Sequence, residues 1–223
     1  MDKPAAERLA APAAKRARGR PRKTAEQRDD GNRRGELLRC AARLFRRQGF
    51  DATSTRDIAA AAGMRSGSPF YHFKTKAALL YAVMEEGMHG AIARQQQAVA
   101  RAGPGLAPAA LLQALVRNHF EVLLGAGSDF VPVMLYEYRS ISTRQRSRLA
   151  QLQGAYEAPW IPVLAALQQE GRLRADVKLA RLLIFGALNW SAQWYDRRQA
   201  AGLDELTAAA LDLFLARPAG EAP

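Results

Sequence analysis

Arginine and lysine side chains near the N-terminus are the groups whose chemistry is easiest to name. Residues 15–23, KRARGRPRK, carry six basic side chains in nine positions. Such a density of positive charge attracts phosphates, and an extended Arg-Gly-Arg segment can enter the narrow minor groove of A·T-rich DNA. We therefore expect Arg18, Arg20 and Arg22 to contact double-stranded DNA, either within the minor groove or by nonspecific attraction to its phosphates.

The positive charge of the chain lies almost wholly in its first third. The 223 residues carry a net charge of +12, from 33 Lys and Arg against 21 Asp and Glu. Residues 1–76 hold 19 basic and 8 acidic side chains, whereas residues 77–223 hold 14 and 13. This asymmetry favours a polyanion-binding head joined to a near-neutral body, with a solubilising basic tail as the alternative.

Short helices separated by glycine follow the basic segment. Apolar residues recur at helical spacing over residues 33–49. Ser54, with Asp57 three residues later, predicts a capped second helix that Gly63 ends. Another short helix is predicted over residues 66–73. A short helix, a glycine turn and a second short helix, set after a longer helix, form the helix-turn-helix arrangement.

Residues 37–80, LLRCAARLFRRQGFDATSTRDIAAAAGMRSGSPFYHFKTKAALL, resemble the DNA-binding domain of the tetracycline-repressor (TetR) family of bacterial transcription regulators. The resemblance is carried by Ala41-Ala42, Leu44-Phe45, Gly49-Phe50, Ala52-Thr53, Asp57-Ile58-Ala59, Ala62-Gly63, Gly67, Tyr71-His72-Phe73 and Lys76. It implies an all-helical homodimer with an effector pocket in the C-terminal domain. Upstream, Arg18-Gly19-Arg20-Pro21 resembles an AT-hook.

The resemblance also implies roles for single residues. Thr55 and Lys76 match positions that contact phosphates, and Arg65 is the candidate for a bidentate contact to guanine. Further residues are expected to face base edges, sugars, phosphates or thymine methyl groups: Ser66, Gly67, Ser68, Phe70, Tyr71 and His72. Pro69 and Phe70 depart from the residues more common in the family, so a tilted or tight first helical turn and one missing hydroxyl–phosphate bond are expected.

The remaining sequence predicts helices throughout, without an alternating strand pattern or an internal repeat. Thr75 is the expected N-cap of a long helix, and breaks are expected at residues 103–105 and 125–128. Later helices are predicted over 107–124, 143–170 (bent near Pro159 and Pro162), 176–198 and 204–216. The chain is therefore expected to be all-α, with a disordered basic arm over residues 1–30, a three-helix DNA-binding domain over 31–76, and an effector-binding and dimerisation domain over 77–223.

The last two predicted helices carry apolar residues on more than one side. In the family these helices pair with their symmetry mates. The resemblance therefore assigns this contact, or the core behind it, to Leu182, Phe185, Leu188, Leu211, Phe214 and Leu215. A dimer with C2 symmetry also predicts a palindromic operator.

Residues 185–195, FGALNWSAQWY, are similar to a segment of family members that respond to acyl-CoA thioesters. Trp190 and Trp194 share one helical face and are expected to form either a wall of the effector pocket or part of the core and dimer packing. The other candidate ligand contacts are polar or aromatic: His119, Phe120, Tyr136, Arg139, Asn189 and Gln193. For Arg139 the alternative is an ion pair with Glu137 or Glu121.

The sequence does not point to an enzyme, a metal or a cofactor. A single cysteine, Cys40, excludes an internal disulfide framework, and the histidines show no zinc spacing. No apolar stretch approaches the length of a membrane span and no secretory signal is evident, so a soluble cytoplasmic protein without membrane contact is expected.

These observations together predict a sequence-specific DNA-binding transcription regulator. In its simplest form it is a repressor that a small-molecule effector, with an acyl-CoA thioester as the class indicated by the second resemblance, releases from its operator. Two alternatives stay open. One is a nonspecific architectural DNA-binding protein that uses the arginine-rich arm. The other is a regulator of the same family controlled by a partner protein.

Overall fold

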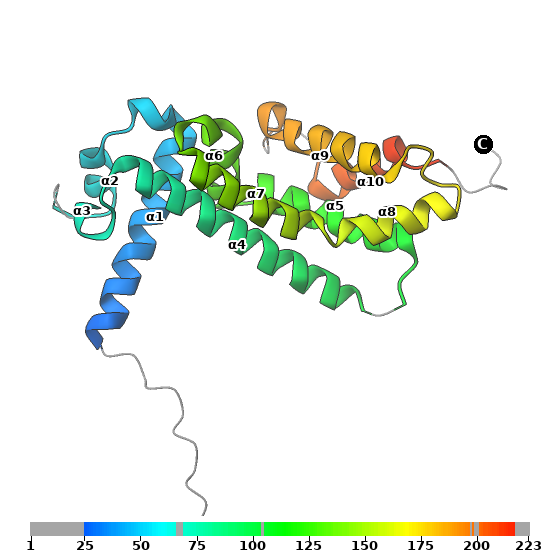
Figure 1. Cartoon of the computed structure of the whole chain (residues 1–223), viewed down its shortest axis with the longest axis horizontal. Helices are drawn as coiled ribbons and strands as arrows, with labels where there is room; N and C mark the ends of the chain where they lie inside the picture. Colours follow the sequence, from blue (N-terminus) through cyan, green and yellow to red (C-terminus); the bar gives the residue numbers. More distant parts are fainter. Residues whose placement is uncertain (1–24, 66–68, 104, 197, 199–200, 217–223) are drawn as a thin grey trace, which may run out of the picture.

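The computed structural model describes residues 25–65, 69–103, 105–196, 198 and 201–216, and every regular element among them is a helix. In chain order these are α1 (Ala25–Ala52), α2 (Thr55–Ala61), α3 (Pro69–His72), α4 (Lys76–Ala102), α5 (Pro108–Leu124), α6 (Phe130–Glu137), the 3-10 helix η1 (Tyr138–Ser140), α7 (Thr143–Glu157), α8 (Trp160–Gln169), α9 (Val177–Trp194) and α10 (Leu203–Phe214). The predicted all-α fold class is confirmed. Figure 1 shows α1–α3, here called the head, at one end of α4, and the body, α4–α10, extending away from it.

Local capping signals set the ends of the head helices. The Ser54 hydroxyl accepts the backbone N–H of Asp57, and the Asp57 carboxylate accepts the backbone N–H of Ser54, so the predicted capping box is confirmed. The Thr75 hydroxyl accepts the N–H of Ala78 at the start of α4, which confirms the predicted N-cap. Gly63 ends the turn after α2 at a φ of +64°, a conformation that suits glycine.

Helix α1 is longer than predicted and bends near its end. It begins at Ala25 rather than near Arg33, and so enters the range in which a disordered arm was expected. At Gly49 the backbone takes φ 80° and ψ 167°, which turns the last residues of the helix aside. A Cβ at this position would lie 3.3 Å from Glu137 Oε1, so glycine also permits the close approach of the end of α6.

Head and body share one continuous core. Leu37 of α1, Ile58 of α2 and Leu80 of α4 are fully buried together, and further along α4 Met84 and Met88 join the core of the body. Helix α4 passes from one part to the other without a break (Figure 1). The domain boundary expected at residues 76 and 77 therefore falls in the first turn of a continuous helix.

Helix α5 is the central element of the body. It packs against α4, α8, α9 and α10, and its side chains Leu112, Leu115, Val116 and Leu123 have no exposed surface. Burial of each aliphatic side chain of this size stabilises the fold by roughly 1.5–3 kcal/mol. Helix α6 lies against α4 at Gly87, where a Cβ would be only 2.8 Å from the Cβ of the first residue of α6. Helix α6 thus packs against both α1 of the head and α4 of the body.

Candidate functional site

The surface expected to read DNA consists of α3 and the turn before it. The Met64 N–H donates to the Ala59 carbonyl at 2.8 Å, which closes α2 and directs the chain toward α3. On α3, Tyr71 is 82% exposed, and its ring meets the His72 ring edge-on with centroids 5.3 Å apart. Arg65, in the turn, is exposed as well. An exposed tyrosine beside a half-buried histidine, and a cation beyond a firmly capped α2, are suited to contact a DNA groove.

Other residues predicted to contact DNA are placed only in part. Thr55 is the first residue of α2 and is half-buried. Several candidates lie outside the described residues or side chains: Arg18, Arg20, Arg22, Ser66, Gly67, Ser68 and Phe70. For these the roles implied by the family resemblance stay predictions.

Lys76, predicted to contact a phosphate, faces the protein instead. Its Nζ donates to the carbonyl oxygens of Phe50 at 2.7 Å and Thr53 at 2.9 Å, and lies 4.2 Å from the centre of the Phe50 ring. Carbonyls at the end of a helix have no partner within that helix, so this ammonium supplies the donors that the end of α1 lacks. In this structure Lys76 joins the start of α4 to the end of α1, and its contact to a phosphate stays a prediction.

Two polar contacts, here called the α6 anchors, tie the end of α1 to the two ends of α6. The Phe50 N–H donates to Glu137 Oε1 at 2.9 Å. Arg46 Nη1 donates to the Ser128 carbonyl at 2.9 Å and to Asp129 Oδ1 at 3.1 Å. Hydrogen bonds with a charged partner are stronger than neutral ones, so these contacts hold the end of α1 against α6.

A buried polar cluster centred on His119 lies in the body. The His119 Nδ1 is 3.1 Å from the Tyr156 hydroxyl, and its Nε2 is 3.2 Å from Asn189 Oδ1. Because an amide oxygen only accepts, Nε2 carries the proton and Nδ1 accepts from Tyr156. Burial lowers the pKa of His119 to about 4, so the imidazole is neutral at pH 7. Burial also raises the pKa of Tyr156 well above its ordinary value, which keeps the phenol protonated.

Gln95 and Trp160 extend this cluster. The Gln95 Nε2 donates to the Tyr156 carbonyl at 2.7 Å, and its Oε1 accepts the Trp160 indole N–H at 2.8 Å. These bonds join positions 61 and 65 residues apart. Sequence reasoning missed Gln95, Tyr156 and Trp160 because no local pattern reports contacts at such separations.

The cluster borders a small pocket of about 40 Å³, lined by His119, Tyr156 and Asn189. The rest of its wall is mainly apolar, from Met88, Ala91, Val122, Val131, Met134 and Leu135. This volume is close to the space that a single water occupies in the liquid, roughly 30 Å³. A larger ligand must therefore push the wall apart, and α6, which contributes three of these apolar residues, carries the contacts to the head.

The structure brings some predicted ligand contacts to the pocket and leaves others away from it. His119 and Asn189 line it, as expected for ligand-facing polar groups. Phe120 is buried in the core without lining the pocket. Tyr136 is partly exposed, and its hydroxyl donates to a backbone carbonyl of α9 at 3.2 Å. Arg139 is exposed on η1.

Trp190, Gln193 and Trp194 lie away from the pocket in the protomer, and the alternative place for the tryptophans, in dimer packing, stays a prediction. The two indoles share a face, as their spacing indicated, but that face points outward, and they are 65% and 56% exposed. Gln193 is exposed too. None of the three lines the pocket around His119, so within one protomer the predicted tryptophan wall is not formed.

The outward face of α9 is a continuous apolar stripe. Leu179, Leu182, Leu183, Trp190 and Trp194 are each more than half exposed, and their spacing places them on one side of the helix. On α10, Leu213 is 83% exposed. An exposed apolar stripe of this length is unusual in a monomer and marks an interaction surface.

The residues predicted for a subunit contact divide between this stripe and the core. Leu182 belongs to the stripe, and Leu211 and Phe214 are half-buried. Phe185, Leu188 and Leu215 are buried within the protomer, which fits the second of the two places expected for them, the core behind the contact. The Phe185 ring, for example, packs 4.7 Å from Trp160 between ring centroids.

Comparison with known proteins decides the family. Residues 37–83 match the profile of bacterial regulatory proteins of the tetR family, and residues 105–217 match the tetracyclin repressor-like C-terminal domain. The chain belongs to the TetR family. Members of this family are helix-turn-helix transcription regulators rather than enzymes.

Several relatives of this TetR-family chain are known. It is 32% identical over 166 residues to the HTH-type transcriptional repressor KstR2 of Rhodococcus jostii (strain RHA1), covering 73% of this chain and 79% of that protein. The ketosteroid transcriptional regulator KstR2 of Mycobacterium tuberculosis matches with a TM-score of 0.69 at 27% identity, over 83% of this chain and 96% of that structure. AibR, solved with isovaleryl coenzyme A and operator DNA, shares the fold with a TM-score of 0.72 at 22% identity, over 82% and 97%.

The described residues form neither a metal-binding cluster nor a membrane-spanning helix. No three His, Cys, Asp or Glu side chains gather there in a group that would hold a metal ion. No helix in this part of the chain has the length and apolar character needed to cross a membrane.

Proposed function

We propose that this TetR-family regulator is a homodimeric repressor that binds a palindromic operator and is released from it by an acyl-CoA thioester. The observation that carries the proposal is the double role of α6. Its residues Val131 and Met134 line the pocket, while Glu137, and Asp129 just before the helix, hold the end of α1. A ligand that opens the pocket displaces α6, and with it the head.

The apolar stripe on α9 supports the homodimer. A second copy related by a two-fold axis would cover Leu183 and Trp190 with the same residues of its partner, and so remove both stripes from water. The same axis would place two recognition elements on one face of the dimer. Two heads in this relation bind half-sites about 34–36 Å apart, which is the basis for expecting a palindrome.

The chemistry of the pocket favours a thioester over a free acid. Its lining includes no unpaired cation: His119 is neutral, and the one acid that lines it, Glu157, is paired with Arg181. A carboxylate would enter such a site without a counter-charge, at a high desolvation cost, whereas a thioester carbonyl needs only a hydrogen-bond donor. The Asn189 Nδ2 is the donor that the cluster offers, because the His119 Nε2–H already donates to Asn189 Oδ1, and the apolar wall accepts the acyl chain. AibR, with the same fold, was solved with isovaleryl coenzyme A.

Release from the operator requires only a modest preference of the effector for the displaced state. A coupling free energy of about 1–3 kcal/mol changes operator affinity roughly 5- to 150-fold. The pocket is small without ligand, so an acyl chain needs the space that a movement of α6 would open. Binding and head displacement are thereby linked in a single equilibrium.

A fluorescence-anisotropy titration tests the proposal. The purified chain is titrated into labelled DNA from upstream of its own gene and into a scrambled duplex. A panel of acyl-CoA thioesters and the matching free acids is then added. One thioester is expected to weaken operator binding at least tenfold, with the free acid inactive. Operator affinity that no saturating thioester changes would reject the effector class, and equal affinity for scrambled DNA would favour the architectural alternative.

A further inference from the structure

A cationic groove lies along α4, on the side that faces α5. It has a volume of about 730 Å³ and is lined by Arg94 and Arg101 of α4 and Arg117 of α5. Arg117 already has partners, since its Nε lies 2.5 Å from Asp204 Oδ1 and its Nη1 lies 3.7 Å from Glu121. No described acidic residue lies within ion-pair distance of Arg94 or Arg101. The groove therefore offers two uncompensated guanidinium groups.

Two buried donors at this groove have no hydrogen-bond acceptor. They are Arg117 Nη1 and the Nδ2 of Asn118, a residue that is only 6% exposed. The Asn118 side chain lies close enough to Tyr156 to oppose the rise in the pKa of that phenol. Its Nδ2 nevertheless has no partner in hydrogen-bond geometry. Buried donors without acceptors are rare in native proteins, and a ligand is one way to satisfy them.

The groove lies next to a second cavity, and this cavity borders the pocket at His119. The second cavity, of about 240 Å³, shares Arg94 with the groove and shares Ala91, Val122 and Val131 with the pocket at His119. The loop over residues 125–128 borders both the groove and this second cavity. Three neighbouring spaces, which share wall residues, thus lie between a cationic surface and a small, mainly apolar interior.

We propose that Arg94 and Arg101 bind the phosphates of the nucleotide part of a coenzyme A thioester. This inference rests on the proposed effector class and adds the place where its charged end is held. The two arginines are seven residues apart on one helix, hence about 10 Å apart along its axis. Such a separation suits a ligand with phosphates at two positions, as coenzyme A has in its diphosphate and its 3′-phosphate. Guanidinium groups bind phosphates through paired hydrogen bonds.

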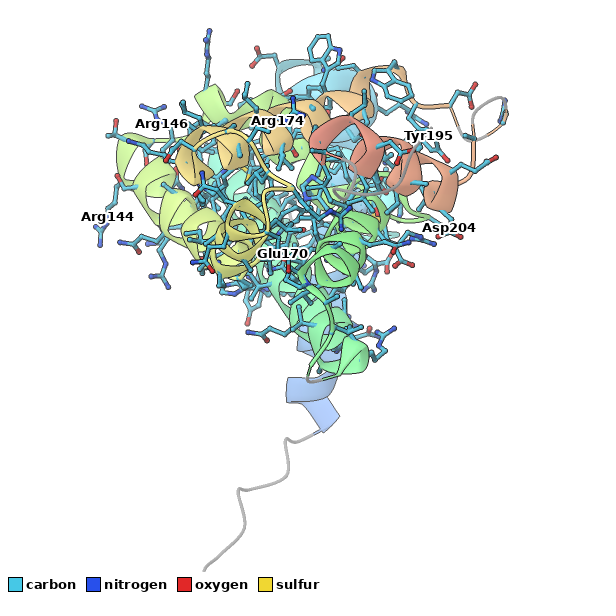
Figure 2. All side chains as sticks on the ribbon, turned by 90° about the vertical axis from the view of Figure 1, so that its right-hand side faces the viewer. Arg144, Arg146, Glu170, Arg174, Tyr195 and Asp204 are labelled. Atoms are coloured by element: carbon cyan, nitrogen blue, oxygen red, sulfur yellow. The ribbon has the colours of Figure 1, made fainter. Side chains whose placement is uncertain are left out.

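The test measures binding of unacylated coenzyme A by isothermal titration calorimetry in the absence of DNA. Arg94→Gln and Arg101→Gln are compared with the wild-type chain. Arg144→Gln is the matched control, an exposed arginine of α7 that Figure 2 shows on the opposite side of the body from Asp204. Each groove variant is expected to raise Kd about tenfold, and the control is expected to leave it unchanged. Dephospho-coenzyme A, which lacks the 3′-phosphate, is expected to bind more weakly than coenzyme A to the wild type.

The outcomes separate this inference from the proposed function. Wild-type affinity for coenzyme A in both groove variants overturns the phosphate site, as does a wild-type chain that does not bind coenzyme A. An equal loss of affinity in Arg144→Gln overturns it too, because the effect would then come from net charge alone. If the groove variants weaken binding while thioesters leave operator affinity unchanged, the phosphate site stands and ligand release is rejected.

Discussion

Acidification from pH 7 to pH 5 is expected to destabilise this protein by about 2 kcal/mol through His119 alone. Burial lowers the pKa of this histidine to about 4, from an ordinary value of 6.5. Because the pKa is depressed in the folded state, the unfolded chain takes up the proton first as the pH falls. The stability that the neutral imidazole preserves is therefore lost progressively between pH 6.5 and pH 4. The full difference corresponds to about 3 kcal/mol, of which roughly 2 kcal/mol is lost by pH 5.

Urea unfolding at fixed protein concentration, at pH 7 and pH 5, measures this loss. His119→Gln retains one donor and one acceptor for Tyr156 and Asn189 but cannot titrate, so its stability is expected to fall less than that of the wild type by about 2 kcal/mol. All carboxylates titrate in both proteins and cancel in the comparison. His89→Gln, which removes an exposed histidine of α4, is expected to behave as the wild type. Identical pH dependence in His119→Gln and wild type would refute a neutral, buried imidazole at this site.

Three further variants test the contacts around the head and the apolar stripe. Glu137→Ala removes the acceptor of the Phe50 N–H and is expected to abolish most effector-induced release in the anisotropy assay. Glu137→Gln keeps an acceptor and is expected to keep the response. Equal release by both variants would contradict the α6 anchor. Lys76→Met leaves carbonyls at the end of α1 unpaired and is expected to lower the free energy of unfolding by about 1–3 kcal/mol. It is expected to leave the salt dependence of operator binding unchanged, whereas Arg65→Gln is expected to flatten it. A flatter salt dependence in Lys76→Met would show that Lys76 contacts a phosphate. Leu183→Glu places charges opposite each other in the proposed dimer and is expected to yield monomers in sedimentation velocity; an undiminished dimer would put the interface elsewhere.

Features set by neighbouring residues were predictable from the sequence. The Ser54–Asp57 capping box, the Thr75 cap and the glycine turn at Gly63 each involve residues within a few positions of one another, and the structure has all three. The ends of α4 and α5 followed the glycine and proline signals for the same reason, whereas the helix predicted over 143–170 is divided into α7 and α8, and α9 ends at Trp194 rather than near residue 198. His119 was also recognised as a pocket residue, because a polar group within an apolar helix must find partners.

Features that depend on the direction of a helix face, or on distant partners, were not predictable. The spacing of Trp190 and Trp194 shows that they share a face, but whether that face points inward depends on how α9 packs on α5 and α8. A lysine at the start of a helix suits a phosphate, but in this structure the ammonium of Lys76 donates to the Phe50 carbonyl at the end of α1. The bond from Phe50 to Glu137 spans 87 residues, and no local pattern reports it.

The unbroken course of α4 gives the molecule a mechanical property. With 27 residues, the helix is about 40 Å long. A tilt of about 5° around its far end moves its first residue by roughly 3.5 Å, which is about the 3.4 Å spacing of successive base pairs. A rotation small enough to leave most side-chain contacts of the body intact therefore moves α3 by one full step along the duplex. Under the proposed function, α4 would thus be a lever arm that converts a slight opening of the pocket into a change of register on DNA.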